Sequence, residues 1–330
     1  MNQLQNEHVT TNQCHFKLVN TLQLGKQDIN YLNYNIKYST LLVGIGRRIC
    51  VFQFNNFQLK LIGSFFNNRE HFSIIYSMQK QKVIITGDST GMLKVYQLSN
   101  INQNRYLYQL KGHDGCISHI AMNSQENDLI TSSVNSTIKF WNQKNIWICY
   151  QTLIQHQDLL LGFSLNESGN QLISYGFDDY ILVTTKVKNK QFWQVIQKIS
   201  NKLFSGGRLS YISDNSFFFQ AGQKDFMIIY NKTANIRLYQ QTSQINLKMS
   251  SSSLDCLSKL QFARQNLVLL TKLDKTINCL KFNESGNIIF QEYIDIQANK
   301  FVVCISEDAN YLFTANNESN QLQIRKNFRI

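Results

Sequence analysis

The sequence predicts an all-β protein that consists of seven similar units of four antiparallel strands, closed into a ring. Three observations predict this architecture. One strand-like segment recurs at a nearly constant interval, the residues between its copies divide into further short strands, and a spare strand precedes the first unit. The chain of 330 residues is long enough to bury a large core, and 43% of it is hydrophobic.

The recurring segment sets the length of the unit. Its seven copies, ICVFQF, LKVYQL, IKFWNQ, ILVTTK, MIIYNK, TINCLK and LQIRKN, begin at Ile49, Leu93, Ile138, Ile181, Met227, Thr276 and Leu322. Successive copies start 44, 45, 43, 46, 49 and 46 residues apart. A period of about 40–50 residues with four strands per repeat is typical of the blades of a β-propeller.

The third and fourth units show the four strands most clearly. In the third unit, polar turns separate ISHIAM, LITSS, IKFW and WICYQTL, and in the fourth they separate GFSL, QLISY, YILV and FWQVIQKI. Alternating apolar residues and many β-branched and aromatic residues favour strands. The chain contains no Pro, so we expect Gly, Asn, Asp and Ser to form the turns.

The two ends of the chain indicate how the ring closes. The last unit ends with LQIRKNFRI and lacks a fourth strand, whereas HFKLVNTLQL at residues 15–24 is a strand without a unit. We expect this strand to become the outer strand of the last blade, because a closed ring has no unpaired end blade. The sequence therefore predicts a flexible segment over residues 1–14 and a single seven-bladed propeller over residues 15–330.

Residues 112–119, GHDGCISH, place two His, one Cys and one Asp close together, and all three residue types bind metal ions. However, Cys116 and His119 are three apart in a predicted strand, which turns their side chains to opposite faces. The alternative is that His113 is structural and buried, since a buried imidazole needs hydrogen-bond partners. We therefore expect no metal site and no cofactor.

The third unit resembles the repeats of the WD40 family, in which a Gly-His pair precedes two apolar positions, a strand rich in Ser or Thr, a tight turn with Asp, and Trp-Asp. The matching residues are Gly112, His113, Ile117, Ile120, Met122, Thr131, Ser132, Ser133, Asn135 and Trp141. Asn135 and Asn142 stand where the family has Asp.

The resemblance is strongest over residues 72–200, and it implies a WD40-type propeller with a buried hydrogen-bond chain inside a blade. The resemblance implies that the hydrogen-bonded side chains are His113, Thr131, Ser133, Asn135 and Trp141 in the third blade and His156, Ser174 and Asp178 in the fourth.

The pentapeptide GDSTG at residues 87–91 fits the G-x-S-x-G pattern of hydrolases, in which a helix after the Ser aims its hydroxyl group. Here a strand, MLKVYQL, follows in phase with the other units. We therefore predict that Ser89 lies in an ordinary tight turn and that the chain is not an enzyme.

Two sets of loops are expected at one end of the propeller: those before each innermost strand and the tight turns before each Trp-type strand. Function usually lies in such loops on a rigid scaffold. The candidate partner-binding residues on this face are Arg47, Arg48, Asn68, Arg69, Glu70, His71, Asp114, Gln157, Asp158, Asp179, Lys202, Lys224, Asp225, Asp274 and Lys275. The adjacent Arg47 and Arg48 are the sharpest candidates, because two guanidinium groups in a turn could hold a carboxylate or phosphate.

The net charge of +12 divides equally, with +6 on residues 1–165 and +6 on the rest. The tightest cluster, Lys186, Lys188 and Lys190, is expected at the opposite end from the candidate face. A positive charge favours acidic partners. Its even spread and the lack of a basic–aromatic RNA motif argue against nucleic acid.

The sequence therefore predicts a non-catalytic WD40 scaffold that binds other proteins, with no small-molecule substrate and no membrane insertion. Two alternatives stay open. Residues 147–156 and FWQVIQKI resemble outer strands of a WD40 branch that docks client proteins in cytosolic iron–sulfur assembly, and the net charge suits a nucleic-acid-associated propeller. The polar N-terminus and the lack of a membrane-length apolar run predict the cytoplasm, with the nucleus as the other possibility.

Overall fold

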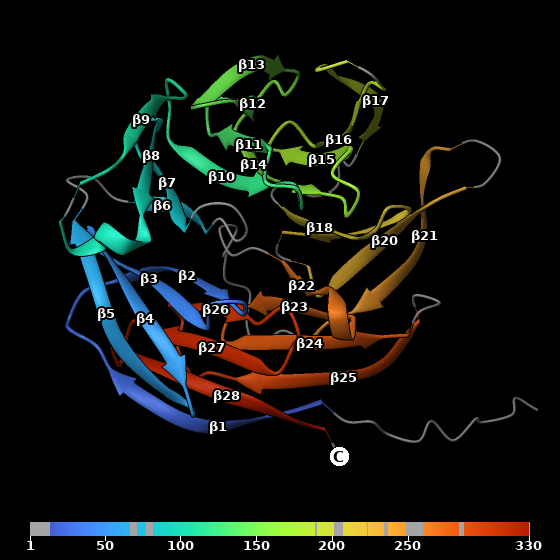
Figure 1. Cartoon of the computed structure of the whole chain (residues 1–330). Helices are drawn as coiled ribbons and strands as arrows, with labels where there is room; N and C mark the ends of the chain where they lie inside the picture. Colours follow the sequence, from blue (N-terminus) through green and yellow to red (C-terminus); the bar gives the residue numbers. More distant parts are fainter. Residues whose placement is uncertain are drawn as a thin grey trace, which may run out of the picture.

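The structure, a computed structural model, describes residues 14–66, 71–76, 82–103, 105–188, 190–200, 207–222, 224–233, 237–248, 260–283 and 287–329. They form seven four-stranded antiparallel sheets. Figure 1 shows the chain passing once around a ring, so that the last sheet lies beside the first. The prediction of a seven-bladed β-propeller is confirmed.

Each blade adds its strands in order from the centre of the ring to the outside. Blades 1 to 4 consist of β2 (Ile29–Asn35), β3 (Thr40–Ile45), β4 (Arg48–Asn55) and β5 (Gln58–Phe66); β6 (His71–Tyr76), β7 (Val83–Asp88), β8 (Met92–Gln97) and β9 (Tyr108–Lys111); β10 (Ile117–Met122), β11 (Asp128–Ser133), β12 (Thr137–Gln143) and β13 (Trp147–Ile154); and β14 (Leu160–Leu165), β15 (Gln171–Gly176), β16 (Tyr180–Lys186) and β17 (Trp193–Ser200).

The remaining three blades follow the same order. Blades 5 to 7 consist of β18 (Gly207–Ser213), β19 (Ser216–Ala221), β20 (Phe226–Lys232) and β21 (Tyr239–Asn246); β22 (Gln261–Ala263), β23 (Val268–Leu273), β24 (Thr276–Phe282) and β25 (Ile288–Asp295); and β26 (Phe301–Ile305), β27 (Tyr311–Asn316), β28 (Gln321–Arg329) and β1 (Cys14–Gln23). The recurring sequence segment is the third strand of every blade, as its constant period predicts.

The N-terminal strand closes the ring. β1 pairs antiparallel with β28 along its whole length, beginning with Cys14 opposite Arg329. The side chain of Asn317 then joins blade 7 to blade 1, since it accepts a hydrogen bond from Ile29 N at 2.9 Å and donates one to Ile29 O at 3.1 Å. The predicted closure is confirmed. Of the segment predicted to be flexible, residues 1–14, the structure describes Cys14 alone and places it at the start of β1; the other residues lie outside the described part of the chain.

The hydrophobic core lies between the blades, where each sheet covers its neighbours. Phe140 of blade 3 stacks on Trp193 of blade 4 with ring centroids 4.8 Å apart, and both are fully buried. Between blades 1 and 2, the ring centroids of Phe65 and Tyr96 lie 4.1 Å apart, with the two rings tilted against each other. Because a single blade cannot bury both of its faces, these contacts make the ring the stable unit.

Glutamine side chains add a polar connection between neighbouring blades. Gln151 in β13 donates to Trp193 O and accepts from Trp193 N, both at 2.7 Å. Gln197 in β17 makes the same pair of hydrogen bonds to Tyr239, at 2.8 and 2.9 Å. The two partners of each pair are 42 residues apart, and the second pair follows the first after 46 residues. One outer strand therefore holds the start of the next by a repeated contact.

Blade 2 departs from the regular pattern. The 3₁₀ segment η1 (Leu98–Gln103) precedes β9, which has four residues instead of the eight of β13 and β17. Ile101 of η1 lies over Gly63 of β5, where a Cβ atom would come within 2.3 Å of its side chain. The segment consists mainly of polar residues around one buried Ile, and its apolar residues show neither the spacing of a strand nor that of a helix. The sequence therefore did not predict this segment.

Candidate functional site

A chain of hydrogen bonds runs through the interior of blade 3. Trp141 Nε1 donates to Thr131 Oγ1 at 2.9 Å, and His113 contacts Thr131 Oγ1 through Nε2 at 2.8 Å and Thr137 Oγ1 through Nδ1 at 2.7 Å. Thr137 Oγ1 donates to Asn135 Oδ1 at 2.7 Å. The sequence did not single out Thr137, which stands between His113 and the turn.

The order of donors fixes the protonation of His113. Trp141 can only donate, so Thr131 accepts from it and donates its own proton to His113 Nε2. Thr137 donates to Asn135, so it accepts from a protonated Nδ1. The neutral imidazole fits both contacts. Burial in turn lowers the pKa of His113 to about 4.

Blade 4 contains a shorter chain. His156 contacts Ser174 Oγ at 2.8 Å and both carboxylate oxygens of Asp178 at 3.0 and 3.1 Å. Burial lowers the pKa of His156, and the hydrogen bond to Asp178 opposes that shift. Thr184 occupies the position of the Trp, and its buried Oγ1 has no hydrogen-bond partner among the described residues. The series of hydrogen bonds in blade 4 therefore ends at Ser174.

Ser133 lies outside the chain of blade 3, although the resemblance includes it. Its Oγ donates to the backbone oxygen of Cys116 at 2.8 Å and holds the loop before β10. Cys116 precedes the strand, and a register shift between Ile117 and His119 interrupts the alternation that the sequence analysis assumed. Among the residues that the structure describes, no three His, Cys, Asp or Glu side chains lie close enough together to hold a metal ion.

The antiparallel order of the strands places the candidate face at one end of the propeller. The connections between blades and the turns between second and third strands lie at this end. They carry these candidate residues: Arg47, Arg48, Asp114, Gln157, Asp158, Asp179, Lys224, Asp225, Asp274 and Lys275. His71 is the first residue of β6, and Asn68, Arg69, Glu70 and Lys202 lie outside the described residues.

The two adjacent Arg residues differ in their surroundings. Arg47 lies in the turn between β3 and β4 and is exposed, after Gly46 with its positive φ of 53°. Arg48 begins β4, and its guanidinium carbon lies 4.3 Å from the centroid of the exposed Phe66 ring. The two side chains thus offer positive charge beside an aromatic ring. Asp274, in contrast, is 4% exposed and does not contribute to the surface of this face.

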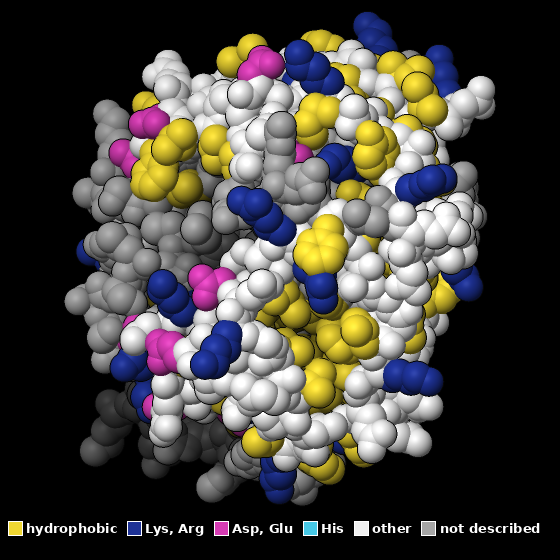
Figure 2. All heavy atoms as spheres, turned by 90° about the vertical axis from the view of Figure 1, so that its left-hand side faces the viewer, with side chains coloured by type: hydrophobic (Ala, Val, Ile, Leu, Met, Phe, Trp, Pro, Cys, Tyr) yellow, Lys and Arg dark blue, Asp and Glu magenta, His cyan; other side chains and the backbone are white. Residues whose placement is uncertain are grey.

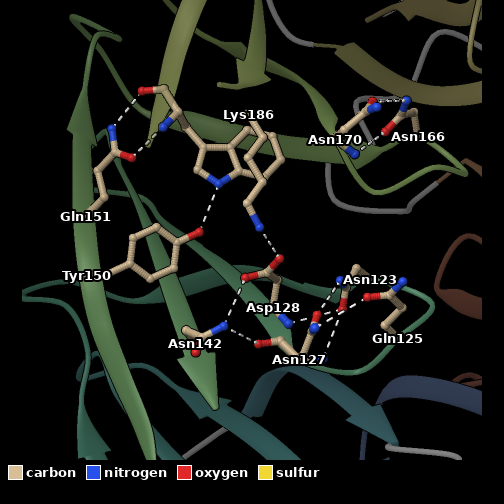
Figure 3. A network of polar contacts seen from close by, with 11 residues as sticks. Asn123, Gln125, Asn127, Asp128, Asn142, Tyr150, Gln151, Asn166, Asn170 and Lys186 are labelled. Carbon is tan, nitrogen blue, oxygen red and sulfur yellow. Dashed lines mark hydrogen bonds and ion pairs between the residues drawn. The ribbon is translucent and has the colours of Figure 1, made fainter. Parts of the chain in front are cut away.

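The three clustered Lys residues lie at the opposite end, beside a cavity of about 370 Å³. Its lining residues are Asn170, Lys186, Val187, Lys188, Lys190 and Gln191. Lys186 Nζ forms an ion pair with the buried Asp128 Oδ2 at 2.5 Å, so it joins blades 3 and 4 (Figure 3). Lys188 and Lys190 are exposed.

Ser89 lies in the tight turn between β7 and β8. Thr90 N, Thr90 Oγ1 and Met92 N donate to Asp88 Oδ1 at 2.9, 2.7 and 3.2 Å and shape this turn. A strand follows the Ser, so the helix that a hydrolase nucleophile needs is not in that place. The prediction of a turn is confirmed.

The comparison with protein families identifies the third blade. A family model described as "WD domain, G-beta repeat" matches residues 104–142, which include β9, β10, β11 and all but the last residue of β12. Together with the seven four-stranded blades, this match places the chain among the WD40-repeat β-propellers. No helix in the described part of the chain is long and apolar enough to cross a membrane.

Three relatives are similar over short segments. An uncharacterized WD repeat-containing protein of Acanthamoeba polyphaga mimivirus is 26% identical over 20% of this chain, and pre-mRNA-processing factor 19 of Bos taurus is 27% identical over 29%. Apoptotic protease-activating factor 1 of Mus musculus is 32% identical over 29% of this chain. These alignments span 12%, 18% and 7% of the relatives, so the chain matches a small part of each.

Proposed function

We propose that the chain is a non-catalytic scaffold that binds other proteins within a multiprotein complex. WD40 propellers bind other proteins. The observation that supports this function most directly is the closed ring of blades, which holds charged loops at one end. A rigid ring fixes these loops in space before a partner binds, which lowers the ordering cost of association. We place this function in the cytoplasm or nucleus, without a cofactor or a small-molecule substrate.

Affinity purification with mass spectrometry tests this proposal. The bait is the full chain, and the variant is Arg47→Glu with Arg48→Glu, whose charge reversal repels an acidic partner. The matched control is Lys188→Glu with Lys190→Glu, which changes the net charge equally at the opposite end. We expect a discrete set of partners that the control retains and the Arg variant loses.

The possible results separate the two parts of the proposal. If both variants retain the same partners as the original chain, the scaffold function stands and the Arg47–Arg48 site is wrong. If the original chain recovers no partner above background, the scaffold function itself is wrong. Circular dichroism of each variant must first match that of the original chain.

Docking of client proteins in iron–sulfur assembly is a more specific form of the proposal. Its support is that WICYQTLI forms β13 and WQVIQKIS forms β17, both of them outer strands as the resemblance requires. Depletion of the protein should then lower the activity of cytosolic iron–sulfur enzymes. Normal activity of those enzymes after depletion would leave the general scaffold function without this specific role.

A further inference from the structure

Blades 1 and 2 carry two thirds of the net positive charge of the chain. Residues 29–111 contain ten Lys and Arg but two Asp and Glu, which gives +8 of the total net charge of +12. The net charges of the two halves of the sequence are equal in spite of this asymmetry, because residues 112–165 contain two Lys and four Asp and Glu and so lower the net charge of the first half. Asp88, the acidic residue that the structure describes in these two blades, is 1% exposed.

The same two blades expose five large hydrophobic side chains on their outer side. Leu61, Ile62 and Phe66 lie on β5, and Tyr106 and Leu107 lie directly before β9. Each of the five is between 39% and 52% exposed. We call these five residues the blade 1–2 surface. Large exposed apolar groups that cluster on a soluble protein mark a site of association.

Two buried aromatic rings lie beneath the blade 1–2 surface, between β5 and the residues before β9. Phe65 of β5 lies against Tyr96 of β8, and Tyr96 in turn lies 6.4 Å from Tyr106. Figure 2 views the side of the molecule that carries β5 and β9, and it shows hydrophobic side chains gathered across the middle of this side. Lys and Arg side chains surround them, and the acidic side chains lie in the left half of the view and along its top.

Cations lie over the aromatic rings of this side. Arg48 is 4.3 Å from the centroid of Phe66, and Lys94 Nζ is 5.8 Å from that of Tyr106. The exposed Lys60 neighbours Leu61 on β5. Positive charge and apolar area are therefore presented together, which fits a binding partner that combines acidic groups with apolar ones.

We propose that the blade 1–2 surface docks an acidic amphipathic segment of a partner protein. Its apolar side chains cover the five exposed residues, and its carboxylates face Arg47, Arg48 and Lys60. A single-stranded nucleic acid would need aromatic platforms for its bases. Phe66 and Tyr106 are aromatic, but Leu61, Ile62 and Leu107 are aliphatic and offer no such platform, so most of the surface suits protein side chains better. This inference rests on the proposed scaffold function and names the chemistry of one partner.

Direct binding measurements with the purified full chain test the proposal. The probe is a fluorescent peptide of about 18 residues, five helical turns, with Glu and Asp on one face and Leu and Phe on the other. A second peptide carries Lys in place of every Glu and Asp. Fluorescence anisotropy should detect binding of the acidic peptide alone, and the affinity should fall as salt is added.

The test variant is Leu61→Asp with Leu107→Asp. The matched control is Ile148→Asp with Ile154→Asp, which changes two exposed residues on the outer strand of blade 3. We expect the test variant to weaken binding of the acidic peptide at least about tenfold and the control to leave it unchanged. Thermal unfolding of all three proteins must agree, because a misfolded variant would lose binding for another reason.

Several results would overturn the proposal. They are equal binding of the basic peptide, no binding of either peptide, or equal losses in the test variant and the control. Tighter binding of poly(U) RNA or of phosphatidylserine vesicles, lost in the test variant, would assign the surface to nucleic acid or to a membrane instead. If affinity purification recovers the same partners with the test variant, the scaffold function stands and this surface is wrong; if the original chain recovers none, both fall.

Discussion

At the scale of single residues, His113 shows how a buried polar group fixes the interior of a blade. The hydrogen-bond chain from Trp141 to Asn135 needs a neutral imidazole, because Nε2 accepts from Thr131 and Nδ1 donates to Thr137. The motif of the third unit indicates His113, Thr131 and Trp141 from the sequence. Thr137 was missed because the family pattern places the contact two residues earlier, at Asn135, and the shift depends on side-chain geometry.

Protonation of His113 makes the stability of the fold depend on pH. Its pKa is about 4 in the folded protein, against 6.5 in the unfolded chain, so the unfolded chain binds the extra proton between these values. The free energy of unfolding therefore falls as the pH drops below 6.5, and the loss ends near pH 4. We expect His113 to contribute a loss of about 2 kcal/mol between pH 7 and pH 5.

Urea unfolding at pH 7 and pH 5 measures this loss. The variant His113→Asn cannot titrate, so its free energy of unfolding should change less between the two pH values, whatever its absolute stability. The pKa of His156 is also lowered in the folded protein, so His156 still contributes to the pH dependence of stability in this variant. An unchanged pH dependence in the variant would show that His113 does not carry it.

At the scale of elements, the outer strands are joined by side chains that the hydrophobic pattern does not reveal. The period and the alternation of apolar residues predicted the third strand of every blade, because the apolar residues that form the pattern stand within the strand itself. The contact of Gln151 with Trp193 links two blades, and its only sign in the sequence is the repeat of Gln and aromatic residues 46 positions later. A contact between units cannot be predicted from the pattern inside one unit.

Removal of the amide of Gln151 should loosen the start of β17. In Gln151→Glu the side chain keeps an acceptor for Trp193 N but can no longer donate to Trp193 O. We expect a loss of about 1–3 kcal/mol in the free energy of unfolding, since a half-buried backbone oxygen loses its partner. The matched control, Gln194→Glu, changes an exposed residue of β17 next to Trp193, and its free energy of unfolding should stay within about 0.5 kcal/mol of the original.

Urea unfolding of the two variants gives the comparison, and hydrogen exchange of the Trp193 amide locates the change. Faster exchange in Gln151→Glu alone is the expected result. Equal stability of the two Glu variants would mean that aromatic packing of Trp193 on Phe140 holds the two blades without help from the Gln.

At the scale of the whole molecule, closure of the ring is the feature that the sequence predicts best. The incomplete last unit and the spare first strand are visible without coordinates, and together they specify the pairing of β1 with β28. The blade 1–2 surface, in contrast, could not be predicted from the sequence. It depends on which side chains of β5 stay exposed beside η1, and η1 itself has no signature in the sequence.

Deletion of residues 1–24 should open the ring. It removes the strand that covers β28, exposes a long unpaired edge and uncovers the interior around Phe16, which is 7% exposed. An unpaired edge strand pairs with other chains, so we expect a lower melting temperature and concentration-dependent oligomers. A control deletion of residues 1–12 leaves β1 intact and should change neither property. Addition of a synthetic peptide of residues 13–25 should restore the monomer and its melting temperature, because the pairing is not covalent. If the shortened chain stays monomeric with an unchanged melting temperature, β1 does not close the ring, and the stability of the propeller must come from the contacts between blades alone.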